Sequence, residues 1–342
     1  MSTVNFSRLE RVYIGSQTTL RTIPNTGGAW DTTTAKRLRH NKLAMTPLIG
    51  YQDAPYKSGS RAPLYGFTDR KGGTWSLTNQ PAILSGTAGT RPDWALLLQS
   101  LFGADSTGNV SNNVYAFNDS GEYPFVLAGF FTSSATMTHR VAWGCVVDEM
   151  TFRFNGNVFD FDANGSVGYV LDSDNFANED TIAKAGLTTF PADPAITTVV
   201  GNPQTGFTGT VTVDGQSIEG DMGNMTVRIQ AGNVLIGDRY TDAYASRVVG
   251  GARRVGMTMT MIDTDASTLT DIKAKAKSRT PVDATIVIGN TAGYTATFAL
   301  KKIVMAAPVF DDGQVYVSLN LGDATAHVSA MDQMDDFTMT LS

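Results

Sequence analysis

The sequence contains few residues of the kinds that form disulfides, metal sites and catalytic centres. Cys145 is the single cysteine, which excludes an intrachain disulfide and a CxxC metal site. Three histidines, His40, His139 and His327, leave little for zinc binding or nucleophilic catalysis. Charged residues make up 17% of the chain, below the roughly 25% usual for globular domains. A surface with so little charge indicates that much of it lies against other subunits.

Long apolar runs are also absent. The longest, Phe125–Phe131, has the length of a strand rather than the roughly 20 residues of a membrane span. The N-terminal arginines precede no apolar stretch, so no secretion signal is expected. With 34 glycines and abundant Thr, Ser, Val and Asn, the composition favours strands and turns, and 342 residues suit two domains. We expect a soluble, mainly β protein made in the cytoplasm.

Charge is unevenly distributed along the chain. Residues 1–70 carry ten Lys/Arg against four Asp/Glu, whereas residues 305–342 carry six aspartates and no Lys/Arg. One basic cluster stands out: Lys36, Arg37, Arg39, His40 and Lys42. It is interpreted as a solvated loop or arm, or as a contact with an acidic surface of another copy. Nucleic-acid binding is disfavoured because the chain is acidic overall, at −6.

Hydrophobic alternation predicts strands along most of the chain. They are expected at residues 74–78, 125–131, 142–147, 208–213, 225–229, 255–262, 284–288 and 295–300. Two tight hairpins are predicted, one turning on Asn155-Gly156 and the other on Asp312-Gly313, because both dipeptides tolerate positive φ.

Only two helices are expected. Pro92 and Asp93 open the first, over residues 95–102, and Gly103 ends it. The second runs over residues 265–277 and is closed by Pro281, with a narrow apolar face of Leu269, Ile272 and Ala276.

The two halves repeat one order of elements: strand, helix, strands, then a hairpin. A shift of 157 residues aligns residues 144–147 with 301–304 and one hairpin turn with the other. We therefore predict a tandem duplication, with chance similarity of β proteins as the alternative. The predicted organisation is an N-terminal arm over 1–44, a first β-domain over 45–170, a linker over 171–206 and a second β-domain over 207–342. The first domain includes a long polar loop at about 103–121.

Motifs for catalysis are missing. The sequence has no GxGxxG after a strand, no GxxxxGK[ST], no HExxH and no GxSxG. Residues 172–183 begin like a calcium loop but lack its glycine and closing glutamate. Asp160 and Asp162 share one strand face, which suits a hydrated sheet surface or an acid/base pair, and the surface is favoured. Cys145 is interpreted as a core residue. We expect no enzyme, no cofactor and no metal.

One stretch is recognisable. Residues 225–229, Gly232-Asn233, residues 237–240 and residues 250–260, which include Arg253-Arg254-Val255-Gly256, resemble the tail tube proteins of long-tailed bacteriophages of the siphovirus type. Residues 46–51 and 72–77 add a weaker resemblance to the start of such proteins. The resemblance implies β-sandwich or β-barrel-like tail-tube domains, each with a short flanking helix, that assemble into stacked rings around a channel.

On this interpretation the chain is a structural virion subunit of the phage tail, assembled in the host cytoplasm, and DNA only passes through its channel. Because the chain has about twice the length of a single-copy tube protein, we expect a homotrimeric ring with pseudo-sixfold symmetry. Partners would be the tape measure, tail terminator and distal tail proteins, with no membrane. The alternative is another ring-forming β-sandwich protein, such as a terminator, a decoration protein or a secretion-tube component. Candidate contacts between rings are Lys36, Arg37, Arg39 and Lys42 with Asp323, Asp332, Asp335 and Asp336.

Overall fold

A computed structural model of the chain describes residues 10–26, 29–30, 35–53, 66–103, 112–118, 123–131, 137–154, 158–194, 196, 201–204, 209–218, 222–237, 242–263, 267–311, 318–327 and 336–342. The fold is mainly β, as the composition predicts. Its strands are β1 Glu10–Ser16, β2 Asn25–Thr26, β3 Ala29–Trp30, β4 Ala35–Leu38, β5 Lys42–Asp53, β6 Gly66–Pro81, β7 Ile83–Leu84, β8 Asn113–Ala116, β9 Phe125–Phe131, β10 Arg140–Phe154, β11 Asp160–Val167, β12 Tyr169–Asp172, β13 Asn202–Pro203, β14 Thr210–Val213, β15 Gln216–Ser217, β16 Met222–Gln230, β17 Val234–Ile236, β18 Arg247–Val249, β19 Arg254–Ile262, β20 Val282–Ile288, β21 Ala296–Ile303, β22 Val309–Asp311, β23 Ser318–Thr325 and β24 Phe337–Leu341.

Both predicted helices are present. Helix α1 spans Ala95–Phe102 and ends at Gly103, whose φ of 65° is the left-handed conformation that favours glycine at this position. Helix α2 spans Ser267–Ser278 and buries Leu269, Ile272 and Ala276, the predicted apolar face. The described residues also include a 3-10 turn, η2, over Phe176–Asn178.

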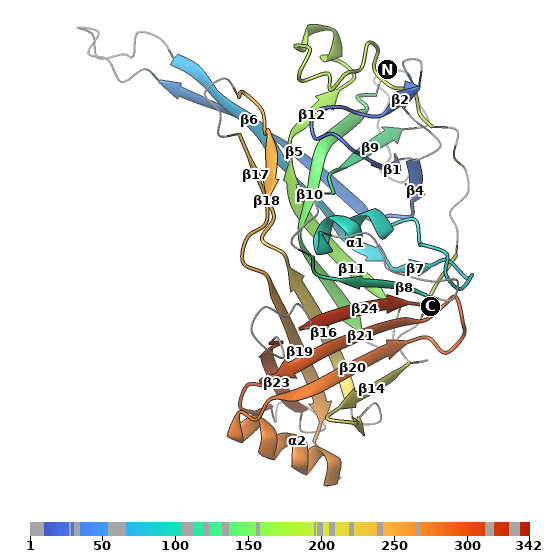
Figure 1. The fold of residues 1–342 in the computed structure, drawn as a ribbon, viewed down its shortest axis with the longest axis vertical. Helices are drawn as coiled ribbons and strands as arrows, with labels where there is room; N and C mark the ends of the chain where they lie inside the picture. Colours follow the sequence, from blue (N-terminus) through green and yellow to red (C-terminus); the bar gives the residue numbers. More distant parts are fainter. Residues whose placement is uncertain are drawn as a thin grey trace, which may run out of the picture.

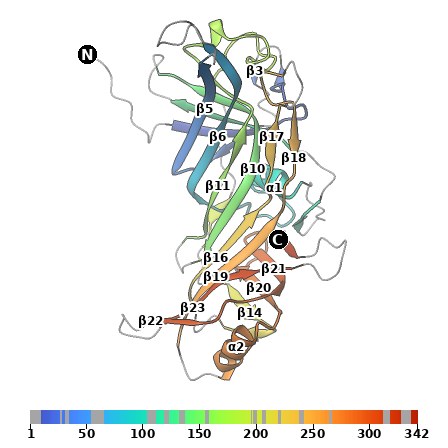
Figure 2. The same ribbon diagram turned by 90° about the vertical axis from the view of Figure 1, so that its left-hand side faces the viewer.

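One long antiparallel sheet runs along the molecule, in the strand order β22-β23-β19-β16-β10-β11-β6-β5 (Figure 2). Strand β10 also belongs to a second layer, because its first half pairs with β9 and β12 and its second half with β11 and β16. The second layer continues from β9 through β1 to β4.

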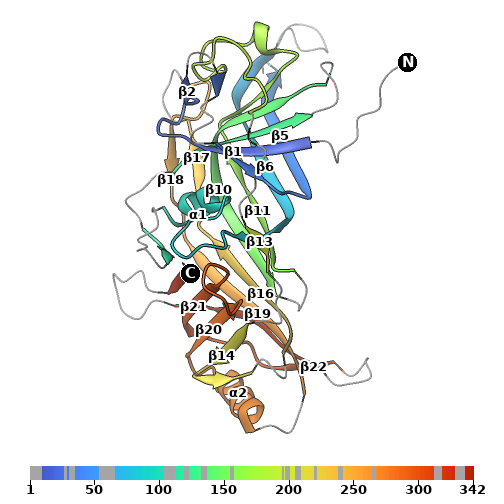
Figure 3. The same ribbon diagram turned by 90° about the vertical axis from the view of Figure 1, so that its right-hand side faces the viewer.

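A separate six-stranded sheet, β15-β14-β20-β21-β24-β8, lies towards the end of the molecule that carries α2 (Figure 1). Figure 3 shows β1 and β14 at different levels of the molecule, each beside the long sheet. The main apolar core lies between the layers and includes side chains from both halves of the chain, such as Phe152, Phe161, Met257 and Phe298, each at most 1% exposed. Burial of this interior is the main force that holds the layers together.

The strand pairings of the first half recur in the second half. The hairpin β5–β6 has its counterpart in β16–β19, and the pairs β6–β11 and β10–β11 have theirs in β19–β23 and β22–β23. In the second layer, β4–β1–β9–β10–β12 corresponds to β15–β14–β20–β21–β24. Every one of these pairs is antiparallel, and each helix lies in the connection before the corresponding strands β9 and β20.

The registers also match, at a shift one residue larger than the sequence suggests. Arg153 pairs with Asp160, and Asp311 pairs with Ser318, so the hairpins correspond at 158 residues rather than 157. Strand β10 has a bulge at Gly144 and β21 has one at Lys302, both with positive φ, of 62° and 45°. The same shift relates these two positions. The tight turns themselves, at 155–157 and 312–317, lie outside the described residues.

Three predicted boundaries need correction. The described residues between 10 and 44 do not form an arm, because β1 is inserted between β4 and β9 with Val12, Tyr13 and Ile14 fully buried. The expected linker does not begin at residue 171, because β12 continues to Asp172 and residues 173–190 pack Phe176 and Leu187 against the first half. The expected polar loop contains β8, which pairs with β24 of the second half. In each case the partner strand or core lies far away in the sequence.

Candidate assembly surface

The long sheet has two free edges. Among the described residues, β5 pairs only with β6, and β22 pairs only with β23. Large apolar side chains are exposed on both edge strands: Leu48 is 65% exposed, Ile49 50% and Val309 65%. An edge strand presents unpaired backbone N–H and C=O groups, which are a template for pairing with another strand. The two edges lie towards opposite ends of the long axis (Figure 2).

The two halves of the chain are joined by a strand pair of the same kind. Strand β10, at the edge of the first half, pairs with β16 of the second half, with Phe152 opposite Val227. Both side chains are fully buried. On the other face of the same junction, the Arg228 guanidinium lies 2.5 Å from the Glu149 carboxylate. The chain therefore contains a complete, packed example of a junction between halves.

The outward face of the central strands is polar and carries charges of both signs. Side chains alternate along β10, β11, β16 and β19, so that every second residue points away from the core. The outward set is Glu149, Thr151, Arg153, Asp160, Asp162, Asn164, Ser166, Asn224, Thr226, Arg228, Gln230, Arg254, Thr258 and Thr260. Asp148, at the bulge of β10, borders the same face beside Asn164 and Ser166, so the face carries three arginines and four carboxylates.

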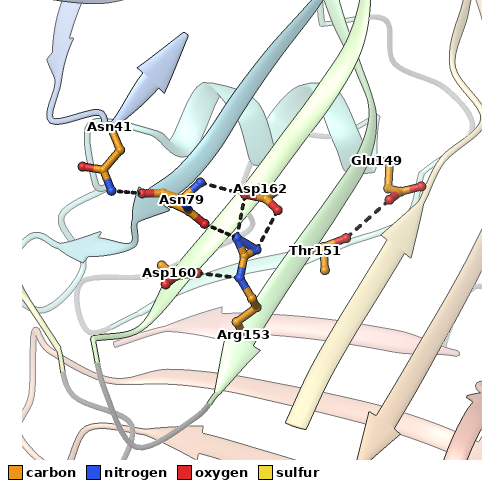
Figure 4. Close-up of polar contacts among 7 residues, drawn as sticks. All are labelled: Asn41, Asn79, Glu149, Thr151, Arg153, Asp160 and Asp162. Atoms are coloured by element: carbon orange, nitrogen blue, oxygen red, sulfur yellow. Dashed lines mark hydrogen bonds and ion pairs between the residues drawn. The ribbon is translucent and has the colours of Figure 1, made fainter. Parts of the chain in front are cut away.

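Arg153 is at the centre of an ionic cluster on this face (Figure 4). Its guanidinium donates to both carboxylate oxygens of Asp162, at 2.6 and 2.7 Å, and forms an ion pair with Asp160 at 3.1 Å. It also donates to the Asn79 side-chain oxygen at 2.7 Å, and the Asn79 N–H donates to Asp162. Burial raises the pKa of Asp160, and the nearby Asp162 carboxylate adds to this, while Arg153 opposes it. The two carboxylates predicted to share a face thus hold one arginine in place.

The basic cluster lies around the turn between β4 and β5. Lys36 and Arg37 are on β4, Arg39 follows it, and Lys42 is the first residue of β5. Lys36, Arg39 and Lys42 are exposed. His40 lies 3.5 Å from the Glu10 carboxylate.

The acidic candidates do not form one group in the described part of the chain. Asp323 is on β23, and Asp332 and Asp335 lie outside the described residues. Asp336 is only 5% exposed, and its carboxylate lies 3.8 Å from the Arg253 guanidinium. Its position just before β24, whose first residue Phe337 is fully buried, draws Asp336 inward. Asp336 therefore does not offer a surface carboxylate, contrary to the expectation from the sequence.

The remaining candidates considered are a reactive cysteine, a metal site and a membrane-spanning helix. Cys145 is fully buried, as predicted for a core residue, and burial raises its thiol pKa. Within the described ranges, no group of three or more His, Cys, Asp or Glu side chains is placed to hold a metal ion. Neither α1 nor α2, the two α-helices in the described part of the chain, is long and apolar enough to cross a membrane.

Comparison with protein-family models and with curated proteins finds no match to this chain. The features that bear on function are therefore the free strand edges and the polar sheet face described above. Sequence reasoning found the Asp160–Asp162 pair and the basic cluster but missed the free edges and Arg153. The alternation of Phe152, Arg153 and Phe154 was the signal that could have placed Arg153 on the outward face.

Proposed function

We propose that this protein is a structural subunit of a phage tail tube, built from two copies of one β-domain, and that it has no catalytic role. The observation that carries the proposal is a single sheet with free edges at both ends, in a chain whose halves repeat the same strand pairings. Each copy offers two different edges, so association is head-to-tail and repeats until a ring closes. Closure removes both free edges of the long sheet.

Three chains would supply six domains to each ring, and stacked rings would form the tube. The polar face of the long sheet would line the channel. Because Arg153 and Arg228 are held by carboxylates, this face has few free cations to retain phosphate groups. DNA would therefore pass without being held. The tape measure, terminator and distal tail proteins would be the partners, and the virion would be the location.

Contacts between rings would join the basic cluster on the β4–β5 turn to Asp323, Asp332 and Asp335 of the neighbouring ring. Each exposed ion pair is worth only about 0.2–1 kcal/mol, but repetition around the ring would favour one stacking direction. Changing Lys36, Arg37 and Arg39 together to Glu should slow tube growth and leave the subunit folded. Growth that is insensitive to both this variant and added salt would show that packing and strand pairing alone join the rings.

Negative-stain electron microscopy of the concentrated protein, with sedimentation over a range of concentration and salt, tests the proposed function. Stacked tubes are the expected result. Isolated rings that never stack would favour a terminator or decoration protein. A folded monomer under every condition would overturn the proposal.

A further inference from the structure

The internal junction between β10 and β16 shows how one half of the chain joins the next. By the register matches above, β16 corresponds to β5: Leu43 pairs with Leu77, and Met225 pairs with Met259, at a common shift of 182 residues. The second half of β10 corresponds to β22 at a shift of 158. The two strands that pair inside the chain are therefore the counterparts of the two strands whose edges are free.

We propose that β22 of one copy pairs with β5 of a second copy, antiparallel and in the register of β10 with β16. This inference rests on the proposed function, because it specifies the contact that would close the ring. Within the chain, Thr151 lies opposite Arg228 and Phe152 opposite Val227. Transferred to the free edges, this register places Val309 opposite Thr46 and Phe310 opposite Met45.

Exposure at equivalent positions supports a covered edge. Ile49, which is 50% exposed, corresponds to Ala231, which is only 5% exposed at the internal junction. Val309, 65% exposed, corresponds to Thr151, which is partly buried there. Apolar side chains at the free edges thus occupy places that the internal junction covers, as expected if a second copy covers them.

The backbone also constrains the register. The Ala231 N–H donates to the Asp148 carbonyl at 2.8 Å, so alternate residues of β10, including Met150 and Phe152, direct their backbone groups at β16. The corresponding residues of β22 are Pro308, just before the strand, and Phe310. In the proposed register Pro308 lies opposite Pro47. Because proline has no backbone N–H, both missing donors then belong to a single residue pair, and the other pairs keep their hydrogen bonds. Prolines at free edges also hinder pairing with unrelated strands.

Engineered disulfides test this register in the full chain. The variant Thr46→Cys/Val309→Cys places a thiol on each free edge, at positions whose internal counterparts are Cα partners. Thr151→Cys/Arg228→Cys, at those counterparts, is the matched internal control, and its disulfide should form within a monomer. Ala44→Cys/Val309→Cys is the control out of register by two residues, at a partly exposed position of the same edge strand that has no part in the basic cluster. Native Cys145 is fully buried and stays in place.

After mild oxidation of assembled protein, non-reducing electrophoresis should show most of the Thr46→Cys/Val309→Cys chains as covalent dimers and trimers, with trimer the largest species. The out-of-register variant should stay near background. Tubes that form without cross-linking of the first variant would overturn the register but leave the proposed function intact. Equal cross-linking of both edge variants would also overturn it. Absence of both cross-links and assembly, with the internal control oxidised normally, would overturn the inference and the proposed function together.

Discussion

The Arg153 cluster gives a prediction with a magnitude that follows from its geometry. Arg153→Met removes two hydrogen bonds to Asp162, the ion pair to Asp160 and the hydrogen bond to Asn79. Breaking a buried ion pair costs about 3–5 kcal/mol, and breaking an exposed pair about 0.2–1 kcal/mol. The Arg153 side chain is 26% exposed and that of Asp162 is 37% exposed, so the cluster lies between these limits. We expect a loss of about 2 kcal/mol in the free energy of unfolding.

The assay is urea unfolding of the unassembled subunit at pH 7, completed as a double-mutant cycle with Asp162→Asn. We expect a coupling energy of about 1 kcal/mol between Arg153 and Asp162, since the pair is bidentate and partly shielded from water. Arg254→Met is the matched control, because Arg254 lies on the same face and its described contact is a 3.4 Å hydrogen bond to Thr325. Its cost should stay below about 0.5 kcal/mol. Equal losses for the two arginine variants, or a coupling energy near zero, would refute the reasoning.

Three further predictions concern stability, each measured by unfolding of the variant beside the wild type. The buried Gln17 amide donates to three backbone carbonyls at 2.8–3.0 Å and accepts from the Gly144 N–H. Gln17→Leu should therefore lower the free energy of unfolding by about 3 kcal/mol or more, and a loss below about 1 kcal/mol would contradict this. Gly144 and Lys302 both have positive φ, which glycine adopts at lower cost than other residues. Gly144→Ala should therefore cost about 1–2 kcal/mol, whereas Lys302→Gly should raise stability by up to about 1 kcal/mol. Effects of the same sign in the two variants would contradict the equivalence of the two bulges. The Lys302 backbone N–H, with the Lys301 ammonium, lowers the pKa of Asp283. The ionised Asp283 carboxylate therefore stabilises the folded state fully above the ordinary aspartate pKa, and this stabilisation is lost as the pH falls through the lowered pKa. The difference between Asp283→Asn and wild type, below about 1 kcal/mol at pH 7 because the carboxylate is half exposed, should therefore shrink below about pH 4, and a difference that grows in acid would contradict the assignment.

Elements with local signals were predictable from the sequence. Helix α1 lies where Pro92 and Gly103 placed it, and β9 has the predicted bounds, because both are encoded by short apolar runs with clear ends. The apolar face of α2 was predicted from its spacing alone. The direct continuation of β10 through residues 140–154 was not predicted, since the bulge at Gly144 looks like a break in the alternation.

Features that depend on distant partners were not predictable. Strand β8 has only four residues, within a stretch rich in Asn, Ser and Gly, and forms because β24 offers it an edge. Strand β1 is buried only because β4 and β9 flank it. The Asp160–Asp162 pair was visible as a pattern, but its partner Arg153 became evident only when the hairpin register was known. The free edges of β5 and β22 are a property of the whole sheet, so no local pattern marks them.

The number of chains in each ring of the assembled tube tests the central claim most directly. The repeat of strand pairings and the two free edges predict three chains of 36.5 kDa per ring, with threefold symmetry that approaches sixfold. Cryo-electron microscopy of tubes grown from the pure protein measures this symmetry, and the mass per unit length provides an independent count. Three chains with six similar domains per ring is the predicted result. Six whole chains per ring, or a folded protein that forms no ring at any concentration, would contradict the account.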